Sequence, residues 1–567
     1  MSDSFDEAHR EPTWFDSVLF YAKTRILILD RLWRERGNQI VAHPKGIGLR
    51  DEAVIAEVSA PLWTQISDAE FPLTAGKVQN LRAACLALDG IEIPAGELFS
   101  FWRQLGRTTR KKGFTEGREL RSGCLIPNIG GGLCQVSGLL HAAAMDAGLE
   151  VVEKHEHSRT LRGSELPPER DATVFWNYVD LRMKASFAWR LQMKLTATDL
   201  VVSIRAVRDD SVSNKATAPA VGLPARAAAD GDCLTCGVTS CFRHPSATKS
   251  HGPAHGHSAY LLEGWWPEFQ DWCGRHAHAG DAWHTPLNGL RWKRPNYGWK
   301  APVGVSMKHQ TWITLMRSWK QRKLPAQGAV RQKFLLESQQ SIALSMARQI
   351  DPKARHLVVS QTLLPHLWKT GVLGGRTYDV LVNRWPMTEL QRRLDEAAAR
   401  YPKSVTLRDF RADEGLVHAE REALAASARI VTPHRGIAGH FGSKSILLDW
   451  QLPESDIRAI PFENSKSWFF PASALGRKGI FEIAEAFRGS ERDLLILGRA
   501  NEGMGDLLKG VKHRPASPDD LPDCAGLVIP AWVEHEPRLA LKALAMGIPV
   551  IASKACGLPA HPLLKEI

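Results

Sequence analysis

The stretch 130–137, GGGLCQVS, combines a glycine turn with a single cysteine. It lies between a loop that contains Pro127 and an apolar run typical of a helix. Glycines let the backbone turn tightly and approach another group closely. We therefore predict that Cys134 opens a helix, where the helix dipole favours the thiolate over the thiol. A cysteine in this setting is suited to reaction or binding more than to packing.

The length and composition of the chain indicate a globular protein with several domains. Its 567 residues are too many for one hydrophobic core. Hydrophobic residues make up 44% and charged residues 24%, which is ordinary for folded proteins. The formal net charge of +12 favours acidic partners such as nucleotide or lipid phosphates. No known nucleic-acid-binding motif accompanies this charge, so we expect no nucleic acid partner.

The N-terminal sequence gives no sign of export. No basic segment followed by an apolar core opens the chain, so no signal peptide is predicted. The stretch 14–33 is amphipathic, but Lys23, Arg25 and Asp30 interrupt it, and no run reaches the ~18 apolar residues of a membrane span. We therefore expect a cytoplasmic protein. In that compartment its nine cysteines are metal ligands, catalytic groups or buried thiols rather than disulfides.

Composition and hydrophobic periodicity divide the chain into five predicted segments. They are a helical lead-in (1–75), a compact α+β unit (76–207), a linker rich in Ala, Pro, Gly and Ser (208–232), a Cys/His-rich segment (233–257) and an α/β region (258–567) with halves at 258–450 and 451–567. Within the α+β unit, residues 172–176 and 200–204 have the pattern of strands.

The α/β region alternates short apolar strands with helical stretches. The predicted strands are 357–359, 429–431, 494–497, 526–529 and 549–552. Strands that are apolar throughout are typical of parallel sheets covered on both faces. The fold class predicted for the whole chain is therefore multidomain, with an α+β domain followed by a doubly wound parallel-sheet region.

Polar residues downstream of Cys134 could complete a catalytic site. A cysteine nucleophile needs a histidine to take its proton and a carboxylate or amide to orient that histidine. The downstream segment supplies His157 and Asp171 in this order. One interpretation is a Cys134–His157 pair oriented by Asp171, acting on an amide. The other is a small residue packed at a tight contact between helix and loop, since free cysteines are usually buried and inert.

Several short motifs between about residues 78 and 206 together resemble the VanW-like family. They are ELFSF at 97–101, GF at 113–114, the stretch 130–137, AGL at 147–149, HEHS at 155–158, DATV at 171–174 and DLR at 180–182. The family is associated with glycopeptide-resistance clusters and cell-wall proteins, so the resemblance implies a domain that recognises or processes a cell-wall component. The cysteine and histidine also resemble the core of transglutaminase-like and papain-like enzymes.

The Cys/His-rich segment contains four metal-ligand side chains within twelve residues. Their spacing, C-x2-C-x4-C-x2-H, is close to known zinc patterns. The predicted ligands are Cys233, Cys236, Cys241 and His244. Three cysteines so spaced could also hold an iron–sulfur cluster, so the metal is zinc or iron–sulfur. The alternative is a loop of unliganded thiols.

The sequence 534–552, EHEPRLALKALAMGIPVIA, resembles the nucleotide-sugar half of retaining GT-B glycosyltransferases. The family pattern is Glu, three residues to Pro, a helix with a second Glu, then Ala-x-Gly-x-Pro-Val-Ile. Lys542 stands where that second Glu is expected. The resemblance implies that Glu534 lies at the donor sugar.

Other residues of this half match further elements of the same family. RKG at 477–479 resembles its Lys-Gly element, and LILG at 495–498 resembles the strand that ends in Gly before the base pocket. The resemblance implies that the donor-binding set includes Arg477, Lys478, Gly479, Gly498 and Glu536. Residues 371–376, GVLGGR, could form the glycine loop beside the acceptor cleft.

A basic and aromatic stretch at 308–333 contains no acidic residue. Arg and Trp together suit an anionic membrane surface. One interpretation is peripheral contact at the inner face of the membrane, where the protein would meet a lipid-linked acceptor. A solvated helix face is the other interpretation.

These patterns lead to one preferred function and two alternatives. The preferred function is transfer of a sugar from a nucleotide diphosphate donor to a cell-envelope glycan or lipid-linked acceptor. The first alternative is a cysteine-dependent acyl transferase or amidase on cell-wall peptides, with the GT-B-like region only binding. The second is a non-enzymatic binding scaffold.

Overall fold

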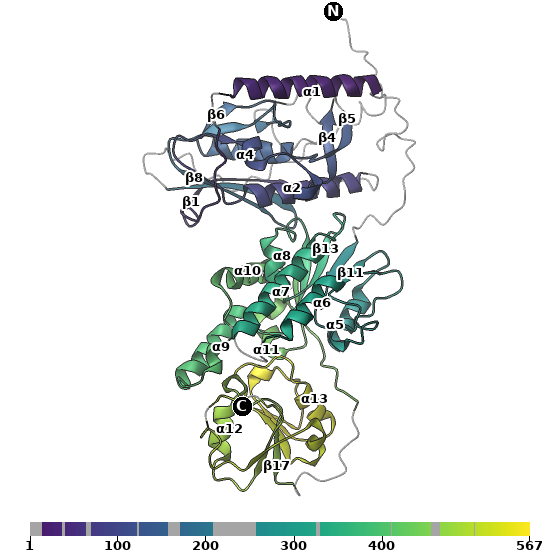
Figure 1. Cartoon of the computed structure of the whole chain (residues 1–567), viewed down its shortest axis with the longest axis vertical. Helices are drawn as coiled ribbons and strands as arrows, with labels where there is room; N and C mark the ends of the chain where they lie inside the picture. Colours follow the sequence, from purple (N-terminus) through teal and green to yellow (C-terminus); the bar gives the residue numbers. More distant parts are fainter. Residues whose placement is uncertain are drawn as a thin grey trace, which may run out of the picture. The chain divides into compact units, whose positions relative to one another are not determined.

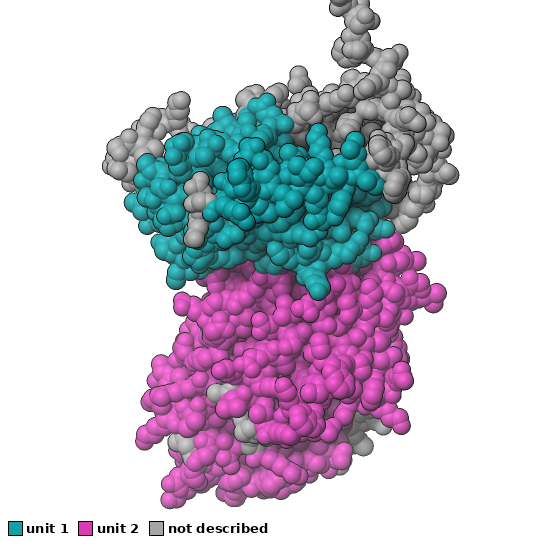
Figure 2. All heavy atoms as spheres, turned by 45° about the horizontal axis from the view of Figure 1, so that its top comes forward, with its two compact units in different colours: residues 1–256, 351–355, 371–376 teal, residues 257–350, 356–370, 377–567 magenta. Residues whose placement is uncertain are grey.

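The computed structural model describes residues 14–36, 40–63, 70–121, 124–156, 170–207, 257–324, 329–409, 411–454, 465–499, 501–503 and 505–567. The chain divides into two compact units, coloured separately in Figure 2. Unit 1 contains residues 1–256, 351–355 and 371–376. Unit 2 contains residues 257–350, 356–370 and 377–567.

Unit 1 is built on a four-stranded antiparallel sheet in the order β1-β9-β8-β2. The strands are β1 (Ala53–Pro61), β9 (Asp199–Ala206), β8 (Trp189–Leu195) and β2 (Glu92–Ile93). Val58 pairs with Val202, and Val202 pairs with Met193, so one register carries apolar side chains across three strands. The predicted strand at 200–204 lies within β9 and is confirmed.

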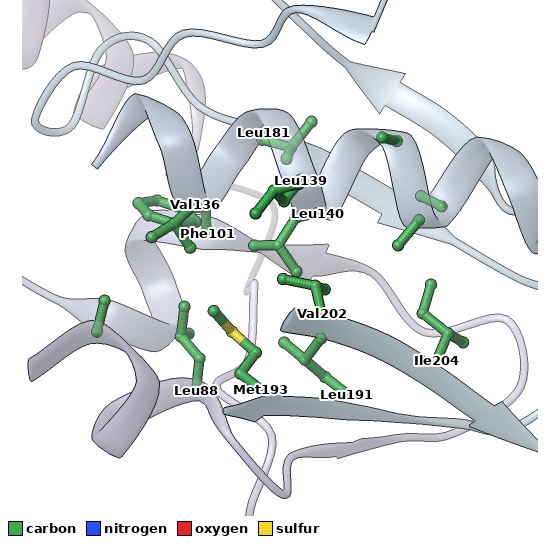
Figure 3. Close-up of a cluster of buried hydrophobic side chains, with 14 of the residues drawn as sticks. Leu88, Phe101, Val136, Leu139, Leu140, Leu181, Leu191, Met193, Val202 and Ile204 are labelled. Carbon is green, nitrogen blue, oxygen red and sulfur yellow. The ribbon is translucent and has the colours of Figure 1, made fainter. Parts of the chain in front are cut away.

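Two helices, α2 (Phe71–Leu88) and α4 (Cys134–Asp146), pack on this sheet and enclose the core of unit 1. Val136, Leu139 and Leu140 of α4 face β8 and β9 in Figure 3. All three are fully buried. Apolar positions three and four residues apart place these side chains on one face of the helix, which explains why α4 lies flat on the sheet.

The remaining elements of unit 1 surround this core. They are α1 (Trp14–Arg34), α3 (Phe101–Leu105), a hairpin of β4 (Glu116–Arg121) and β5 (Cys124–Ile129), and a sheet of β3 (Phe99–Ser100), β7 (Arg182–Lys184) and β6 (Glu150–Glu153). The strand predicted at 172–176 is wrong, because only an isolated bridge joins Phe175 to Val179. The backbone there makes separate bonds instead of a ladder: the amide of Thr173 donates to the carbonyl of His155, and the amide of Phe175 donates to the carbonyl of Val179.

The first half of unit 2 is a seven-stranded sheet whose neighbouring strands all pair in parallel. In spatial order its strands are β12 (Ser306–His309), β11 (Ala282–Thr285), β10 (Ser258–Leu261), β13 (His356–Ser360), β14 (Thr377–Leu381), β15 (Arg429–Thr432) and β16 (Ser445–Leu447). Counted along the chain this order is 3-2-1-4-5-6-7, so the direction of winding reverses between β10 and β13.

The second half of unit 2 is a six-stranded parallel sheet of the same design. Its strands are β19 (His513–Pro515), β18 (Asp493–Ile496), β17 (Ser467–Phe470), β20 (Gly526–Ile529), β21 (Val550–Ala552) and β22 (Leu564–Glu566). Their order, 3-2-1-4-5-6, is that of a doubly wound dinucleotide-type fold. Its switch point lies between β17 and β20.

Helices connect the parallel strands of unit 2 (Figure 1). They are α5 (Pro267–His276), α6 (Thr311–Gln321), α7 (Ala329–Ala347), α8 (Leu364–Lys369), α9 (Met387–Arg400), α10 (Glu414–Ala426), α11 (Arg435–Phe441), α12 (Ile480–Phe487) and α13 (Arg538–Ala545). The parallel-sheet region is therefore confirmed, and the strands predicted from apolar runs coincide with β13, β15, β18, β20 and β21. The position of each switch point now locates the candidate site, since ligands of such sheets bind outside the carboxyl ends of the strands there.

Candidate functional site

A lysine and a glutamate meet at the switch point of the second sheet. Lys478 follows β17, and Glu534 follows β20, so the loops that carry them leave neighbouring strands at the same edge. The Nζ atom of Lys478 lies 2.7 Å from Oε2 of Glu534. The side chains are 18% and 9% exposed, so most of this ion pair is removed from solvent. Two residues 56 positions apart are thus joined at the point where the fold predicts a ligand.

The surroundings of Glu534 stabilise its charged form. The backbone amides of His535 and Glu536 donate to its other oxygen, Oε1, over 2.9 and 3.1 Å. Burial alone would raise the pKa of this carboxyl, but the Lys478 ammonium and these contacts lower the pKa to about 2. Burial lowers the pKa of the adjacent His535 to about 4, so that imidazole is neutral near pH 7.

Two glycines permit the close approach of loops around this pair. Gly479 has φ +85°, and a Cβ atom there would lie 2.2 Å from the carbonyl oxygen of Pro530 in the loop after β20. A Cβ on Gly498, after β18, would lie 2.1 Å from the hydroxyl of Ser473. Side chains at these positions would push the loops apart, so both glycines are required by the local backbone.

Arg477 and Glu502 hold the loop after β17 in place. Burial lowers the pKa of Arg477, and its carbonyl accepts bonds from the amides of Trp532 and Val533. The buried carboxylate of Glu502 accepts from the amide of Gly476 and from the hydroxyls of two residues in the first half. The loop that presents Lys478 is thereby tied both to the loop after β20 and to the first half of unit 2.

A pocket of about 310 Å³ lies at the switch point of the first sheet. Its lining residues come from the segments that follow β10, β13 and β14, from a loop near residue 296, and from the loop just before α13. They are Glu263, Gly264, Trp265, Trp266, Asn296, Tyr297, Thr362, Asn383 and Glu536. Glu536 therefore lines this pocket, while its backbone amide contacts Glu534 at the second switch point. Burial raises the pKa of Glu536, although Arg538 acts in the opposite direction.

Two buried polar groups of the lining residues have no hydrogen-bond partner within the described part of the chain. They are the hydroxyl of Thr362 and the indole N–H of Trp265. Glu263, in contrast, is satisfied, because Arg317 donates to its carboxylate over 2.8 Å. Buried donors without partners are costly and call for a ligand or water. These residues escaped the sequence interpretation because they come from short segments far apart in the chain. Only the positions of some of these segments directly after apolar strands could have indicated them.

An ion pair joins the two halves of unit 2 beside this pocket. Both guanidinium Nη atoms of Arg538 donate to the fully buried carboxylate of Glu268, over 2.7 and 2.8 Å. Arg538 also lies over the rings of Trp266 and Trp450 at 5.0 and 5.2 Å.

The glycine loop predicted beside the acceptor cleft, residues 371–376, does not line this pocket. These residues group with unit 1.

In unit 1 the glycine turn and its cysteine have the predicted local geometry. Cys134 is the first residue of α4, and Gly130 and Gly132 have φ +87° and +98°. Cys134 is half-buried, whereas the other described cysteines whose side chains can be assessed are buried. Its sulfur lies 3.3 Å from the hydroxyl of Thr173, two residues after the predicted orienting group Asp171. His157, the predicted base, lies outside the described residues.

Asn80 of α2 positions the glycine turn, a role that no sequence pattern indicates. Its amide donates to the carbonyl oxygens of Gly131 and Thr115 over 2.9 and 3.0 Å. Its own oxygen accepts from the amide of Thr115 over 2.8 Å. The side chain of Asn80 is fully buried, so these three bonds fix the turn against the hairpin from inside the core.

Two other predictions concern metals and membranes. Cys233, Cys236, Cys241 and His244 lie outside the described residues, so the predicted zinc or iron–sulfur site stays a prediction. Among the described ranges no group of three or more His, Cys, Asp or Glu side chains could hold a metal ion. Within the same ranges no helix is both long and apolar enough to cross a membrane.

Comparison with known proteins identifies the N-terminal domain. Residues 76–207 match the family described as "VanW like protein". An uncharacterized protein of Bacillus subtilis, YoaR, is 31% identical over 137 residues, which is 24% of this chain and 45% of YoaR. The vancomycin B-type resistance protein VanW of Enterococcus faecalis is 26% identical over 155 residues, covering 26% of this chain and 54% of VanW. The chain therefore spans about half the length of the curated relatives it matches.

Solved glycosyltransferase structures resemble another part of the chain. Anabaena HepE, solved with UDP and glucose, covers 55% of this chain and 86% of its own, at 13% identity and a TM-score of 0.31. WaaG, a glycosyltransferase of lipopolysaccharide biosynthesis, covers 55% and 85% at the same identity and TM-score. At these scores the assignment of the fold rests on the sheet topology described above. The chain thus combines a VanW-like domain at residues 76–207 with a region of two parallel sheets that is similar in structure to GT-B glycosyltransferases.

Proposed function

We propose that the region 258–567 transfers a sugar from a nucleotide diphosphate donor to a hydroxyl group of a cell-envelope glycan or lipid-linked acceptor. The observation that carries this proposal is the Lys478–Glu534 contact at the switch point of the second sheet. A cation and an anion are held there by two separate loops, at the edge where doubly wound sheets bind nucleotides.

Each of the predicted donor-site residues has a physical role in this proposal. Lys478 and Arg477 would neutralise the diphosphate, which also gains from the amides at the N-terminus of α12. The diphosphate competes with Glu534 for Lys478 and frees the carboxylate to contact the donor sugar. Gly479 and Gly498 let the loops around Lys478 lie close together and so shape the donor site. Transfer breaks the bond from the anomeric carbon to the diphosphate oxygen and forms one to the acceptor oxygen, whose proton passes to the departing diphosphate.

The pocket at the first switch point would receive the acceptor. Its carboxylate, amide and hydroxyl groups match the hydroxyls of a sugar, and its two tryptophans offer apolar surfaces against which a sugar ring can pack. Thr362 and Trp265 supply hydrogen-bonding groups that lack partners in the described protein. Glu536, just before α13, lines this pocket and belongs to the same loop as Glu534.

The test is a thermal-shift screen of nucleotide diphosphate sugars on the full chain. It compares wild type with the near-isosteric double variant Lys478→Met/Glu534→Gln, which removes both charges together and so leaves no unpaired buried ion. A donor that binds the native state raises its melting temperature. We expect one donor class to stabilise wild type and not the variant, with release of nucleoside diphosphate when a glycan acceptor is added. Lys512→Ala, an exposed lysine of the same half, is the matched control.

Equal stabilisation of wild type and the double variant would place the donor elsewhere. No shift by any donor at millimolar concentration would refute the proposal and attribute the Lys478–Glu534 pair to the fold alone.

A peripheral membrane contact through α6 is a second proposal, and it rests on a separate observation. Trp312, Met316 and Trp319 lie three and four residues apart on this helix and are 74%, 37% and 51% exposed. The ammonium of Lys323 lies 3.8 Å from the centre of the Trp319 ring. Exposed tryptophans with adjacent lysines are typical of helices that bind anionic lipid surfaces. Replacing both tryptophans with serine should reduce binding of the full chain to vesicles that contain phosphatidylglycerol.

For the VanW-like domain we propose recognition or processing of a cell-wall component, with Cys134, His157 and Asp171 as the reactive set. The half-buried position of Cys134 at the start of α4 supports this assignment. Alkylation at neutral pH followed by peptide mapping tests it. We expect Cys134 to react before the buried Cys85, Cys273, Cys524 and Cys556. Equal labelling of all five in the folded protein would contradict it.

A structural zinc ion or iron–sulfur cluster at Cys233, Cys236, Cys241 and His244 is the corresponding proposal for the Cys/His segment. Elemental analysis of the purified chain should find about one zinc or several iron atoms per molecule. The content should fall in a Cys233→Ser/Cys236→Ser variant.

A further inference from the structure

Helix α1 (Trp14–Arg34) is fixed to unit 1 through one of its faces. Arg31 donates through both Nη atoms to the carboxylate of Glu153, over 2.8 and 2.6 Å, and to the carbonyl of Tyr178 over 3.0 Å. The side chain of Arg31 is only 14% exposed. Arg182 adds an ion pair to Glu35, just beyond the helix. These contacts hold α1 along the surface of unit 1, as Figure 1 shows.

The opposite face of α1 is apolar and open. Seven large hydrophobic side chains on this helix are between 44% and 68% exposed. They are Val18, Leu19, Tyr21, Ile26, Leu29, Leu32 and Trp33. At about 100° per residue, five of them fall within a sector about 100° wide, centred near Trp33, and Tyr21 and Leu32 extend that sector on one side. A folded domain gains nothing from exposing such a stripe, so it indicates an interaction surface.

The charges around this face are mostly positive. Lys23, Arg25, Arg34 and Arg36 are exposed, and the nearby Asp30 is paired with Arg34 at 2.8 Å. Arg25 lies within the apolar sector, but its guanidinium lies over the ring of Tyr21 at 4.8 Å. A long cationic side chain can extend in this way beside apolar groups and keep its charge at the rim.

We propose that the exposed face of α1 binds in the plane of an anionic lipid surface, with its apolar side chains inserted and its cations on lipid phosphates. Charge complementarity favours lipid, and so do the exposed aromatic side chains of Tyr21 and Trp33 within the stripe. The breadth of the apolar sector argues against a coiled coil with a second copy. Such a seam is narrower and needs about three or four heptads, whereas Leu19 to Trp33 spans two. This inference is independent of sugar transfer and concerns residues distant in sequence from α6.

The test is co-sedimentation of the full chain with vesicles of phosphatidylcholine, with and without phosphatidylglycerol. Wild type should bind the anionic vesicles and bind neutral vesicles much more weakly. The variant Ile26→Glu/Leu29→Glu places two charges in the stripe and should weaken binding about tenfold or more. Ile47→Glu, at another position of unit 1 that is 80% exposed, is the matched control and should bind like wild type. Circular dichroism confirms that each variant is folded.

Three outcomes separate this proposal from its competitors. Unchanged vesicle binding in Ile26→Glu/Leu29→Glu overturns it, and loss of binding only in the α6 tryptophan variant assigns the contact to α6 alone. A wild-type dimer in light scattering that becomes a monomer in Ile26→Glu/Leu29→Glu, without vesicle binding by either protein, identifies a second copy as the occupant. A parallel loss in Lys23→Glu/Arg25→Glu, restricted to anionic vesicles, supports the role of the cations.

Discussion

Unit 2 contains two switch points of the same strand order, and they differ in how their polar groups are satisfied. At the second sheet, Lys478 and Glu534 neutralise each other, and two backbone amides donate hydrogen bonds to the other carboxylate oxygen of Glu534. At the first sheet, Thr362 and Trp265 line a pocket with groups that have no partner within the described ranges. One site is internally paired and the other is open.

Because of this difference, substitutions at the two switch points should have opposite effects on the stability of the unliganded protein. A buried ion pair is destabilising to break, because the remaining charge has no compensation. A buried hydroxyl without a partner already destabilises the unliganded protein, so removing it relieves that cost. Variants at the second switch point should therefore lose stability, whereas variants at the first should retain it and lose binding.

Lys478→Ala should have the largest effect. It leaves the Glu534 carboxylate buried without its counter-ion, which costs about 3–5 kcal/mol in the free energy of unfolding. Urea unfolding at pH 7, followed by circular dichroism, measures the change. The double variant Lys478→Met/Glu534→Gln should recover most of the loss, because it removes both charges.

The matched control is Lys512→Ala. Lys512 also lies 2.7 Å from a carboxylate, that of Glu491, but both side chains are more than half exposed. Solvent screens this pair, so no measurable change is expected. If both lysine variants were equally stable, the Lys478–Glu534 contact would be no stronger than a surface pair, and the contrast between the two switch points would disappear.

The same contrast explains what the sequence could predict. Lys478 and Glu534 lie in the short runs RKG and EHEP, each of which resembles a motif of the GT-B family within three or four consecutive residues. The alternation of apolar strands and helical stretches also predicted the strands around them. The pocket at the first sheet is assembled from short, separate segments between positions 263 and 536, which only the folded chain brings together. In unit 1 the glycine turn was visible as three adjacent glycines, but its support by Asn80 comes from a helix 50 residues earlier.

The strand predicted at 172–176 fails for a related physical reason. Its apolar alternation is compatible with a strand, but no neighbouring strand offers a ladder there, and the segment lies against α4 instead. The hydroxyl of Ser137 donates to the carbonyl of Ala172 over 2.6 Å, and the amide of Thr173 donates to the carbonyl of His155. Tertiary contacts override local β propensity where no partner strand exists.

Acid should weaken the second switch point at low pH. The pKa of Glu534 is lowered to about 2 in the folded protein, against about 4.5 when unfolded. The stabilisation is present above pH 4.5 and is lost as pH falls toward 2, with a total of about 3 kcal/mol. The unfolding free energy of Glu534→Gln should therefore depend less on pH in this window than that of wild type. Glu485→Gln, an exposed carboxylate on α12, should keep the wild-type slope.

At the first switch point, acidification should lower the free energy of unfolding in a higher pH range than at the second. Burial lowers the pKa of His366, on α8, to about 4, against about 6.5 when unfolded. The folded protein therefore prefers the neutral imidazole. Its contribution is complete above pH 6.5 and declines as pH falls toward 4, by about 2 kcal/mol after allowance for solvent near the pocket.

Urea unfolding of His366→Gln between pH 7 and pH 4 tests this second window. Its stability should fall less steeply with acid than that of wild type, whereas His513→Gln, at an exposed position on β19, should follow wild type. An unchanged slope in His366→Gln would mean that the imidazole is hydrated in the folded state. The two switch points would then differ in charge but not in burial.

Thr362→Val should have the smallest effect on stability and the most informative sign. The substitution keeps the shape of the side chain and removes a buried hydroxyl that has no partner in the described structure. The unliganded protein should be unchanged or more stable by up to about 1 kcal/mol. Sugar transfer, measured as release of nucleoside diphosphate, should instead require more acceptor, because a hydrogen bond to the ligand is gone. A loss of stability comparable with that of Lys478→Ala would show that the hydroxyl is satisfied inside the protein. The open pocket would then be as self-contained as the ion pair at the second sheet.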